Sequence, residues 1–165
     1  MIRPMGLDDI QRVAEIHVFA QRMVYNGIVS DKLLFAETTV AGRAEEFAKL
    51  ISKHGCHGFV YDDGGIIRGF LIVFPCTDTK KANTLEIDRI FADPLMRGQR
   101  IGSKLESFCQ SFAADKGYDE VCLWVLEGNH LAIKFYEKMG YTFDGSKKIT
   151  MNGEATSVRY SKRLK

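Results

Sequence analysis

The stretch "LEIDRIFADPLMRGQRIGSKL", Leu85–Leu105, begins as an apolar strand and ends with the spacing of a helix. At the junction, Gly98 and Gly102 either let the backbone turn or leave room for an anion at the helix N-terminus. Free N–H groups and the positive end of the helix dipole converge there, and Arg97 and Arg100 add charge. The nucleotide-binding patterns G-x-x-x-x-G-K-[ST] and G-x-G-x-x-G are both absent. The stretch alone therefore leaves a plain turn and an anion site open.

The residues around this stretch predict a mixed α/β sheet. A buried strand at 120–126 follows the helix, and such a strand–helix–strand unit favours a parallel pair with a right-handed crossover. Turn signals at 62–65 and at Asn152-Gly153 predict antiparallel hairpins. We therefore expect an α/β (α+β) fold with helices on both faces of the sheet. The expected helices cover 7–25, 41–54, 101–117 and 129–140, with a cap at Ser30 starting a further one, and the strands 1–5, 57–75 (two), 84–92, 120–126, 141–149 and 155–164.

Composition limits the function classes. The chain has 165 residues and no linker or repeat, which predicts one domain over 1–165. A net charge of +2 with both signs interspersed gives no case for nucleic acid, and no apolar run approaches a membrane span. Four cysteines without a C-x-x-C pair indicate reduced thiols in a cytoplasmic protein. His54, Cys56 and His57 lack a fourth ligand at zinc spacing, so we expect no metal.

A second motif, "LWVLEGNHLAIKFYEKMGYTFDG", follows the first in the order seen in one known family. Together the two stretches resemble the GNAT superfamily of acetyl-CoA-dependent N-acyltransferases. The pyrophosphate loop of that family reads [QR]-x-x-G-x-[GA], and residues 97–102 match it except that Arg100 stands at the first glycine position. The pattern N-x-x-A-x-x-[FY]-Y-x-x-x-G-[FY] is complete from Asn129 to Tyr141. The resemblance implies the GNAT fold, with a parallel strand pair that splays apart, and acetyl-CoA as co-substrate.

The departure at Arg100 matters only if the family glycine needs a positive φ. We expect Arg100 to be entering the helix, where it keeps its N–H and adds a cation that reaches a CoA phosphate.

The resemblance also implies a direct attack of an amine on the acetyl thioester. Glu86 is the expected base, with Asp88 behind it on the same face of the strand; the alternatives are a water chain, or carboxylates that only pair with Arg89. A backbone N–H of the segment 90–92 polarises the carbonyl. Tyr136 protonates or hydrogen-bonds the leaving sulfur, although buried aromatic residues often only fill a core.

The remaining expectations concern the two ligands. The acceptor pocket is expected under a roof made by 17–35 and the hairpin at 152–153, with His17 and Tyr25 as acceptor contacts, although His17 is equally well explained as a half-buried core histidine. Trp124 is expected in the core. Acidic residues, including Glu37 and Glu154, predict a cationic amine unless those two are solvated surface charges too far from the cleft. The acceptor is expected to be a small-molecule amine. The alternatives are a protein acetyltransferase, which would need an open groove, and an inactive CoA-binding sensor. The chain is expected to be a monomer or homodimer. The expected CoA contacts are Ile90, Phe91, Ala92, Arg97, Gly98, Gln99, Arg100, Ile101, Gly102, Ser103, Asn129, Ala132, Phe135 and Lys138.

Overall fold

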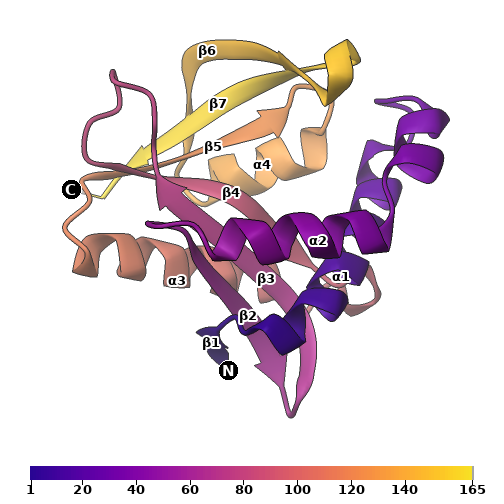
Figure 1. The fold of residues 1–165 in the computed structure, drawn as a ribbon. Helices are drawn as coiled ribbons and strands as arrows, with labels where there is room; N and C mark the ends of the chain where they lie inside the picture. The colour runs from indigo at the N-terminus through magenta and orange to yellow at the C-terminus, as the bar shows by residue number, and fades with distance from the viewer. Residues whose placement is uncertain (165) are drawn as a thin grey trace.

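A seven-stranded mixed sheet forms the centre of the computed structural model, which describes residues 1–164 (Figure 1). Its strand order is β1-β2-β3-β4-β5-β7-β6. Neighbouring strands are antiparallel except for β4 and β5, which are parallel as predicted. The predicted fold class is confirmed. The strands are β1 Ile2–Pro4, β2 His57–Asp63, β3 Ile66–Pro75, β4 Thr84–Ala92, β5 Glu120–Leu126, β6 Thr142–Thr150 and β7 Ala155–Arg163.

Helices cover both faces of this sheet (Figure 1). Helices α1, Ile10–Tyr25, and α2, Val40–Ile51, pack on one face over Phe70 and Ile72. Helices α3, Ile101–Asp115, and α4, His130–Lys138, pack on the other face over Leu71 and Val73. Alternate residues of β3 point to opposite faces, so one apolar strand contributes to both cores. Short turns complete the chain: η1 Leu7–Asp9, η3 Pro94–Met96, η4 Met151–Gly153 and η2 Lys32–Glu37, a π-helical turn in the segment expected to start a helix at Ser30.

The parallel pair separates halfway along its length. Pairing between β4 and β5 covers only Thr84–Ile87 and Glu120–Leu123. Beyond this point β4 continues along β3 to Ala92, and β5 continues along β7 to Leu126. A register shift in the β3–β4 ladder leaves Asp88 as the extra, bulged residue at the point of separation. Two strand edges with unpaired backbone groups therefore face each other across a gap.

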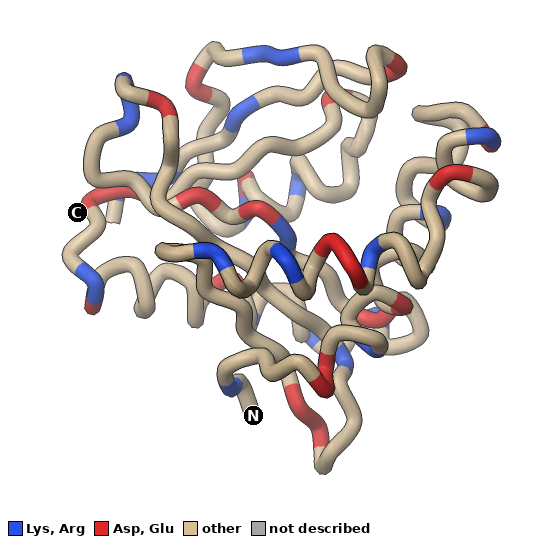
Figure 2. The backbone as a smooth tube through the Cα atoms, viewed as in Figure 1, with Lys and Arg blue, Asp and Glu red and all other residues tan. Residues whose placement is uncertain are grey.

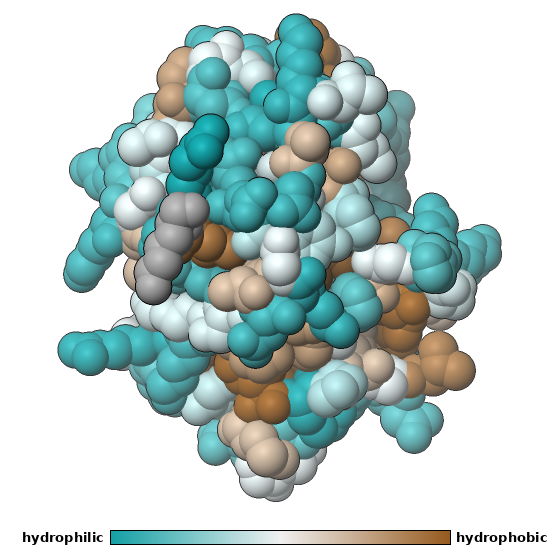
Figure 3. Space-filling model, turned by 90° about the vertical axis from the view of Figure 1, so that its left-hand side faces the viewer, coloured by the Kyte–Doolittle hydropathy of each residue, from teal (hydrophilic) through white to brown (hydrophobic). Residues whose placement is uncertain are grey.

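Charged residues of both signs are interspersed along the chain (Figure 2). The face shown in Figure 3 is mostly hydrophilic, with its apolar side chains in small separate groups. Within residues 1–164, no helix combines the length and the apolar character needed to cross a bilayer.

Candidate active site

Two cavities meet at the gap between β4 and β5. The first has a volume of about 250 Å³ and is lined by Glu86, Asp88 and Trp124 among others. The second has a volume of about 430 Å³ and extends to Arg97 and Gly102 at the start of α3. Residues of β4 and of α4 with its N-cap line both cavities: Ile90, Phe91, Asn129, Ala132 and Tyr136. The two cavities are therefore adjacent at these five residues, and molecules bound in them come closest together there.

The far end of the larger cavity is the loop before α3. The first turn of α3 leaves its N–H groups without helical partners, and no side chain among residues 1–164 caps it. Gly102 lines the cavity, and a Cβ at this position would meet only Phe135, at 3.8 Å. Arg97 and Arg100 are exposed and form no ion pair within residues 1–164. Backbone donors, space and unpaired cations thus gather at one helix N-terminus, which suits a polyphosphate.

The backbone at Arg100 differs from the sequence-based expectation. Arg100 has φ 58° and ψ 23°, the left-handed conformation, and it precedes the first residue of α3. Side chains with a Cβ rarely adopt this conformation because the Cβ approaches the following carbonyl oxygen. The family glycine is therefore a conformational requirement, and the expectation that Arg100 already enters the helix is wrong. Arg100 keeps its N–H and its charge but occupies a strained position.

The wall of the larger cavity at β4 is backbone as well as side chain. Ile90, Phe91 and Ala92 pair with Leu71, Phe70 and Gly69 of β3 on one side only. In an antiparallel pair, alternate residues turn their N–H and C=O groups to opposite sides. Part of the 90–92 backbone therefore faces the gap, where a donor is free for a ligand carbonyl. Across the gap, Asn129 accepts a hydrogen bond from the Ala132 N–H (3.2 Å) and so caps α4 while lining both cavities.

Tyr136 lies at the junction of the two cavities. Its side chain is 9% exposed, and its ring contacts Phe135 and Tyr141 at centroid distances of 5.2 and 5.8 Å. Burial, followed by the proximity of Tyr25, raises the pKa of Tyr136 above its usual value. The phenol therefore stays protonated at neutral pH and is available as a donor.

Glu86 and Asp88 both line the smaller cavity, as predicted, but their environments differ. Asp88 accepts a hydrogen bond from Arg89 at 2.9 Å. Glu86 forms no ion pair within residues 1–164 and accepts a hydrogen bond from the Cys76 thiol at 3.4 Å. Burial raises the pKa of Glu86, and the Cys76 contact opposes this only in part. Glu86 is thus the carboxylate of the pair whose charge is not already neutralised.

The acetyltransferase (GNAT) family profile matches residues 25–141, which include Glu86, the loop before α3 and Tyr136. The chain belongs to the GNAT family. It is 37% identical over 144 residues to an uncharacterized N-acetyltransferase of Methanocaldococcus jannaschii, covering 85% of this chain and 59% of that protein. A spermine/spermidine N(1)-acetyltransferase of Bacillus subtilis is 30% identical over 112 residues, covering 63% of this chain and 72% of that protein. The PaiA N-acetyltransferase of Thermoplasma acidophilum, solved with coenzyme A, shares the fold with TM-score 0.74 and 20% identity over 96% of each chain.

Membership explains the geometry of the larger cavity. GNAT proteins are acetyl-CoA-dependent acyltransferases, and acetyl-CoA is the co-substrate of this one. The cavity that runs from the α3 N-terminus to the gap has the free N–H groups and the open strand edge that a pyrophosphate and a pantetheine arm need. Lys138, at the opposite end of α4, is exposed and lines neither cavity.

His17 does not reach the acceptor side of this GNAT site. It is fully buried in α1, with ring centroids of Phe47 and Phe91 at 5.1 and 4.7 Å. Burial lowers the pKa of His17 well below its usual value, so the ring is neutral. The expectation that His17 contacts the acceptor is therefore corrected: it is a core residue, whereas Tyr25 does line the smaller cavity.

Several residues of the smaller cavity were missed in the sequence. Trp124, expected in the core, is half-buried and lines the cavity with Lys148 over its ring at 4.1 Å. Trp124 lies two residues after Cys122, the ladder partner of Glu86, so its side chain is on the same face of the sheet as Glu86. The alternation of side chains along β5 was therefore the sequence signal that could have placed Trp124 in the cavity. Arg43 and Lys148 come from elements remote in sequence, and no local pattern marks them.

The two carboxylates expected at the roof lie outside the cavity. Glu37 is exposed and pairs with Lys32 at 3.1 Å. Glu154 accepts hydrogen bonds from the backbone N–H and the hydroxyl of Ser30, at 2.6 and 2.8 Å. Both hydrogen bonds join the β6–β7 hairpin to the loop after α1, so Glu154 has a structural role in the roof. The prediction of a cavity dominated by acidic residues is wrong, because three cations also line it: Arg43, Arg89 and Lys148.

Proposed function

We propose that this protein transfers the acetyl group of acetyl-CoA to a primary amine of a small molecule by direct attack in a ternary complex. One observation carries the proposal: the two cavities meet at a shared wall that includes Tyr136, with Glu86 on one side and the α3 N-terminus on the other. This arrangement supports a ternary complex in which an acceptor and a CoA thioester lie in contact.

The proposed mechanism assigns each chemical requirement to a residue or backbone group of the site. Glu86, directly or through water, removes the proton from the amine, whose ammonium form has a pKa of about 10. A backbone N–H of the segment 90–92 stabilises the developing oxyanion. The protonated Tyr136 donates its hydrogen bond to the departing thiolate. Since burial raises the pKa of Tyr136 above that of a thiol, this interaction stabilises the sulfur without a complete proton transfer.

The size and closure of the acceptor cavity support a small molecule over a peptide. Its volume is about 250 Å³, and the Ser30–Glu154 hydrogen bonds hold its roof together. A bound peptide would have to separate the two roof elements. The Bacillus subtilis relative, named for spermine and spermidine, is consistent with a small-molecule amine as the acceptor class.

The charges of the cavity suggest what else the acceptor carries. Arg89 pairs with Asp88, and both Arg89 and Arg43 contact Glu46. The two charges that form no ion pair within residues 1–164 are Glu86 and Lys148. An amine beside Glu86 with an anionic group near Lys148 would satisfy both charges. We therefore expect an amino acid to be used at least as well as a diamine of equal length.

The test is an acetyl-CoA turnover screen with thiol release as the readout, over diamines, polyamines, amino acids, aminoglycosides and peptides. Glu86→Gln and Tyr136→Phe are expected to lower kcat by about 10- to 1000-fold while the Kd for CoA stays the same. Asp88→Asn is the matched control, because Asp88 is already paired, and its effect is expected to be smaller. A Glu86→Gln enzyme with unchanged kcat/KM would refute the assignment of the base. An inactive wild type that binds CoA would point to a sensor.

A further inference from the structure

A group of metal-ligating side chains lies at the acceptor cavity and joins Glu86 to two cysteines that have no part in the proposed acetyl transfer. The Cys76 and Cys122 thiols and the Glu86 carboxylate place their ligand atoms within 4.8 Å of one another. Cys76 follows β3, and its backbone N–H donates to the Thr84 carbonyl at 2.8 Å. Cys122 in β5 is the ladder partner of Glu86 in β4. The sheet itself therefore brings these three side chains together on one face.

The two sulfurs are placed for a shared ion rather than for a disulfide. Strand β4 lies between β3 and β5, so two strand spacings of about 4.7–4.9 Å separate the backbones of Cys76 and Cys122. Disulfides require Cα atoms no more than about 7 Å apart. Both side chains lean over β4 toward Glu86, which closes the distance between sulfurs but not between backbones. An ion at about 2.3 Å from each sulfur can bridge such a pair without moving a strand.

We propose that Cys76, Cys122 and Glu86 bind one thiophilic divalent cation, such as Zn²⁺ or Cd²⁺, and that the bound ion inhibits the enzyme. Two sulfurs and one carboxylate oxygen supply three ligands, and water completes a tetrahedron. The two thiols release their protons to solvent as they bind. Hard ions such as Mg²⁺ and Ca²⁺ prefer all-oxygen sites and are expected not to bind here.

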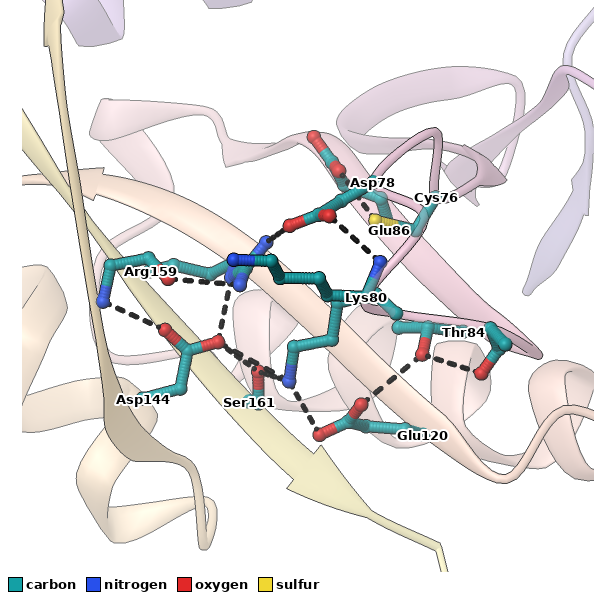
Figure 4. Close-up of polar contacts among 12 residues, drawn as sticks. Cys76, Asp78, Lys80, Thr84, Glu86, Glu120, Asp144, Arg159 and Ser161 are labelled. Atoms are coloured by element: carbon teal, nitrogen blue, oxygen red, sulfur yellow. Dashed lines mark hydrogen bonds and ion pairs between the residues drawn. The ribbon is translucent and has the colours of Figure 1, made fainter.

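The surroundings allow an ion to reach and occupy the site. Glu86 lines the acceptor cavity and Cys76 is half-buried, so the ion enters from the cavity side, whereas Cys122 is fully buried. The nearby cation Arg159 is already paired with Asp78 and Asp144, each at 2.6 Å (Figure 4). Arg159 therefore adds little repulsion, and the charge of Lys148 near Glu86 is outweighed by the three negative charges of two thiolates and a carboxylate.

Inhibition follows because the ion and the acceptor amine compete for one carboxylate. With Glu86 bound to the metal, its oxygen is no longer free to accept a proton from the amine. This part rests on the proposed function, whereas metal binding itself does not. The two parts are therefore measured separately.

Binding is measured on the full chain without acetyl-CoA. Cd²⁺ is titrated while the sulfur-to-cadmium charge-transfer absorbance is recorded, and Zn²⁺ is titrated by calorimetry. We expect one ion per chain with the absorbance of two thiolates. Cys76→Ser is expected to lose half of this absorbance or more and to weaken binding by about 10-fold or more, since loss of even an outer-shell partner typically costs about 10- to 100-fold. Cys56→Ser is the matched control, because Cys56 is a half-buried cysteine outside the group, and it is expected to bind like wild type.

Cys122→Ala serves as the second variant, and thermal unfolding checks that each variant is folded. Wild-type binding retained in both Cys76→Ser and Cys122→Ala, or no binding by the wild type, would overturn the metal site. Turnover is then measured with and without Zn²⁺, and we expect the ratio of the two rates to return toward one in Cys76→Ser. Stoichiometric binding with no loss of turnover would overturn the inhibitory part and, with it, the assignment of Glu86 as the base.

Discussion

Replacing Arg100 by glycine is expected to stabilise the fold and weaken CoA binding at the same time. Arg100 has φ 58° and ψ 23°, where a residue with a Cβ costs about 1–2 kcal/mol relative to its preferred regions. Glycine removes this cost but adds about 0.5–1 kcal/mol of conformational entropy to the unfolded chain. The expected net gain is roughly 0.5–1 kcal/mol. For a domain of this size this corresponds to a rise in Tm of about 1–4 °C.

The same substitution removes a guanidinium from the loop that faces the phosphates. Arg100 is exposed, so its contact with an anion is worth about 0.2–1 kcal/mol, and the Kd for CoA is expected to rise by about 1.4- to 5-fold. Arg100→Ala is the matched control. It loses the same cation but keeps a Cβ in the left-handed conformation, so its Tm is expected to stay near that of wild type.

The measurements are differential scanning calorimetry and CoA titration on all three proteins. An equal or higher Tm for the alanine variant than for the glycine variant would refute the left-handed backbone at position 100. An unchanged Kd in both variants would refute the contribution of the guanidinium to phosphate binding.

Three further substitutions test other parts of the structure. Gly69→Ala is expected to destabilise the fold by about 1–3 kcal/mol in urea unfolding, because the new Cβ would lie 2.8 Å from the Ile101 side chain and 3.0 Å from a backbone oxygen. An unchanged free energy of unfolding would contradict the tight contact between α3 and β3. His17→Leu is expected to raise the free energy of unfolding by about 1 kcal/mol and to retain turnover, because both ring nitrogens are buried without partners; a large loss of kcat would return His17 to the acceptor site. Burial alone would raise the pKa of Asp144, but hydrogen bonds from Ser146, Arg159 and Lys81 outweigh it and lower the pKa to about 2. Its stabilising contribution is therefore complete above the unfolded-state pKa of 3.8 and is lost as pH falls toward 2. The difference in free energy of unfolding between wild type and Asp144→Asn, measured in urea, should close over that interval. A difference that does not depend on pH would contradict the network in Figure 4.

Periodicity and turn residues were sufficient to predict the secondary structure. Hydrophobic period and turn chemistry are local properties, so the strand–helix–strand unit from β4 to β5 and the hairpins could be assigned without knowing what packs against them. The family motifs at 97–102 and 129–141 likewise contribute contiguous segments to the larger cavity, whereas its lining from α1 was marked by neither motif.

The acceptor side was decided only by the tertiary structure. Trp124 on β5 and Lys148 on β6 lie on either side of β7, and the Lys148 side chain reaches the Trp124 ring across that strand. A strand order with non-consecutive neighbours cannot be read from local sequence. Glu154 was expected to be an acidic residue of the pocket or a solvated surface charge, but the fold places Ser30 beside it as a hydrogen-bond donor. His17 is a second example: helical spacing placed it on the buried face of α1, but only packing showed that its ring is enclosed against Phe47 and Phe91 and lines neither cavity. The charge state and role of a polar residue depend on neighbours distant in sequence, and those neighbours exist only once the chain has folded.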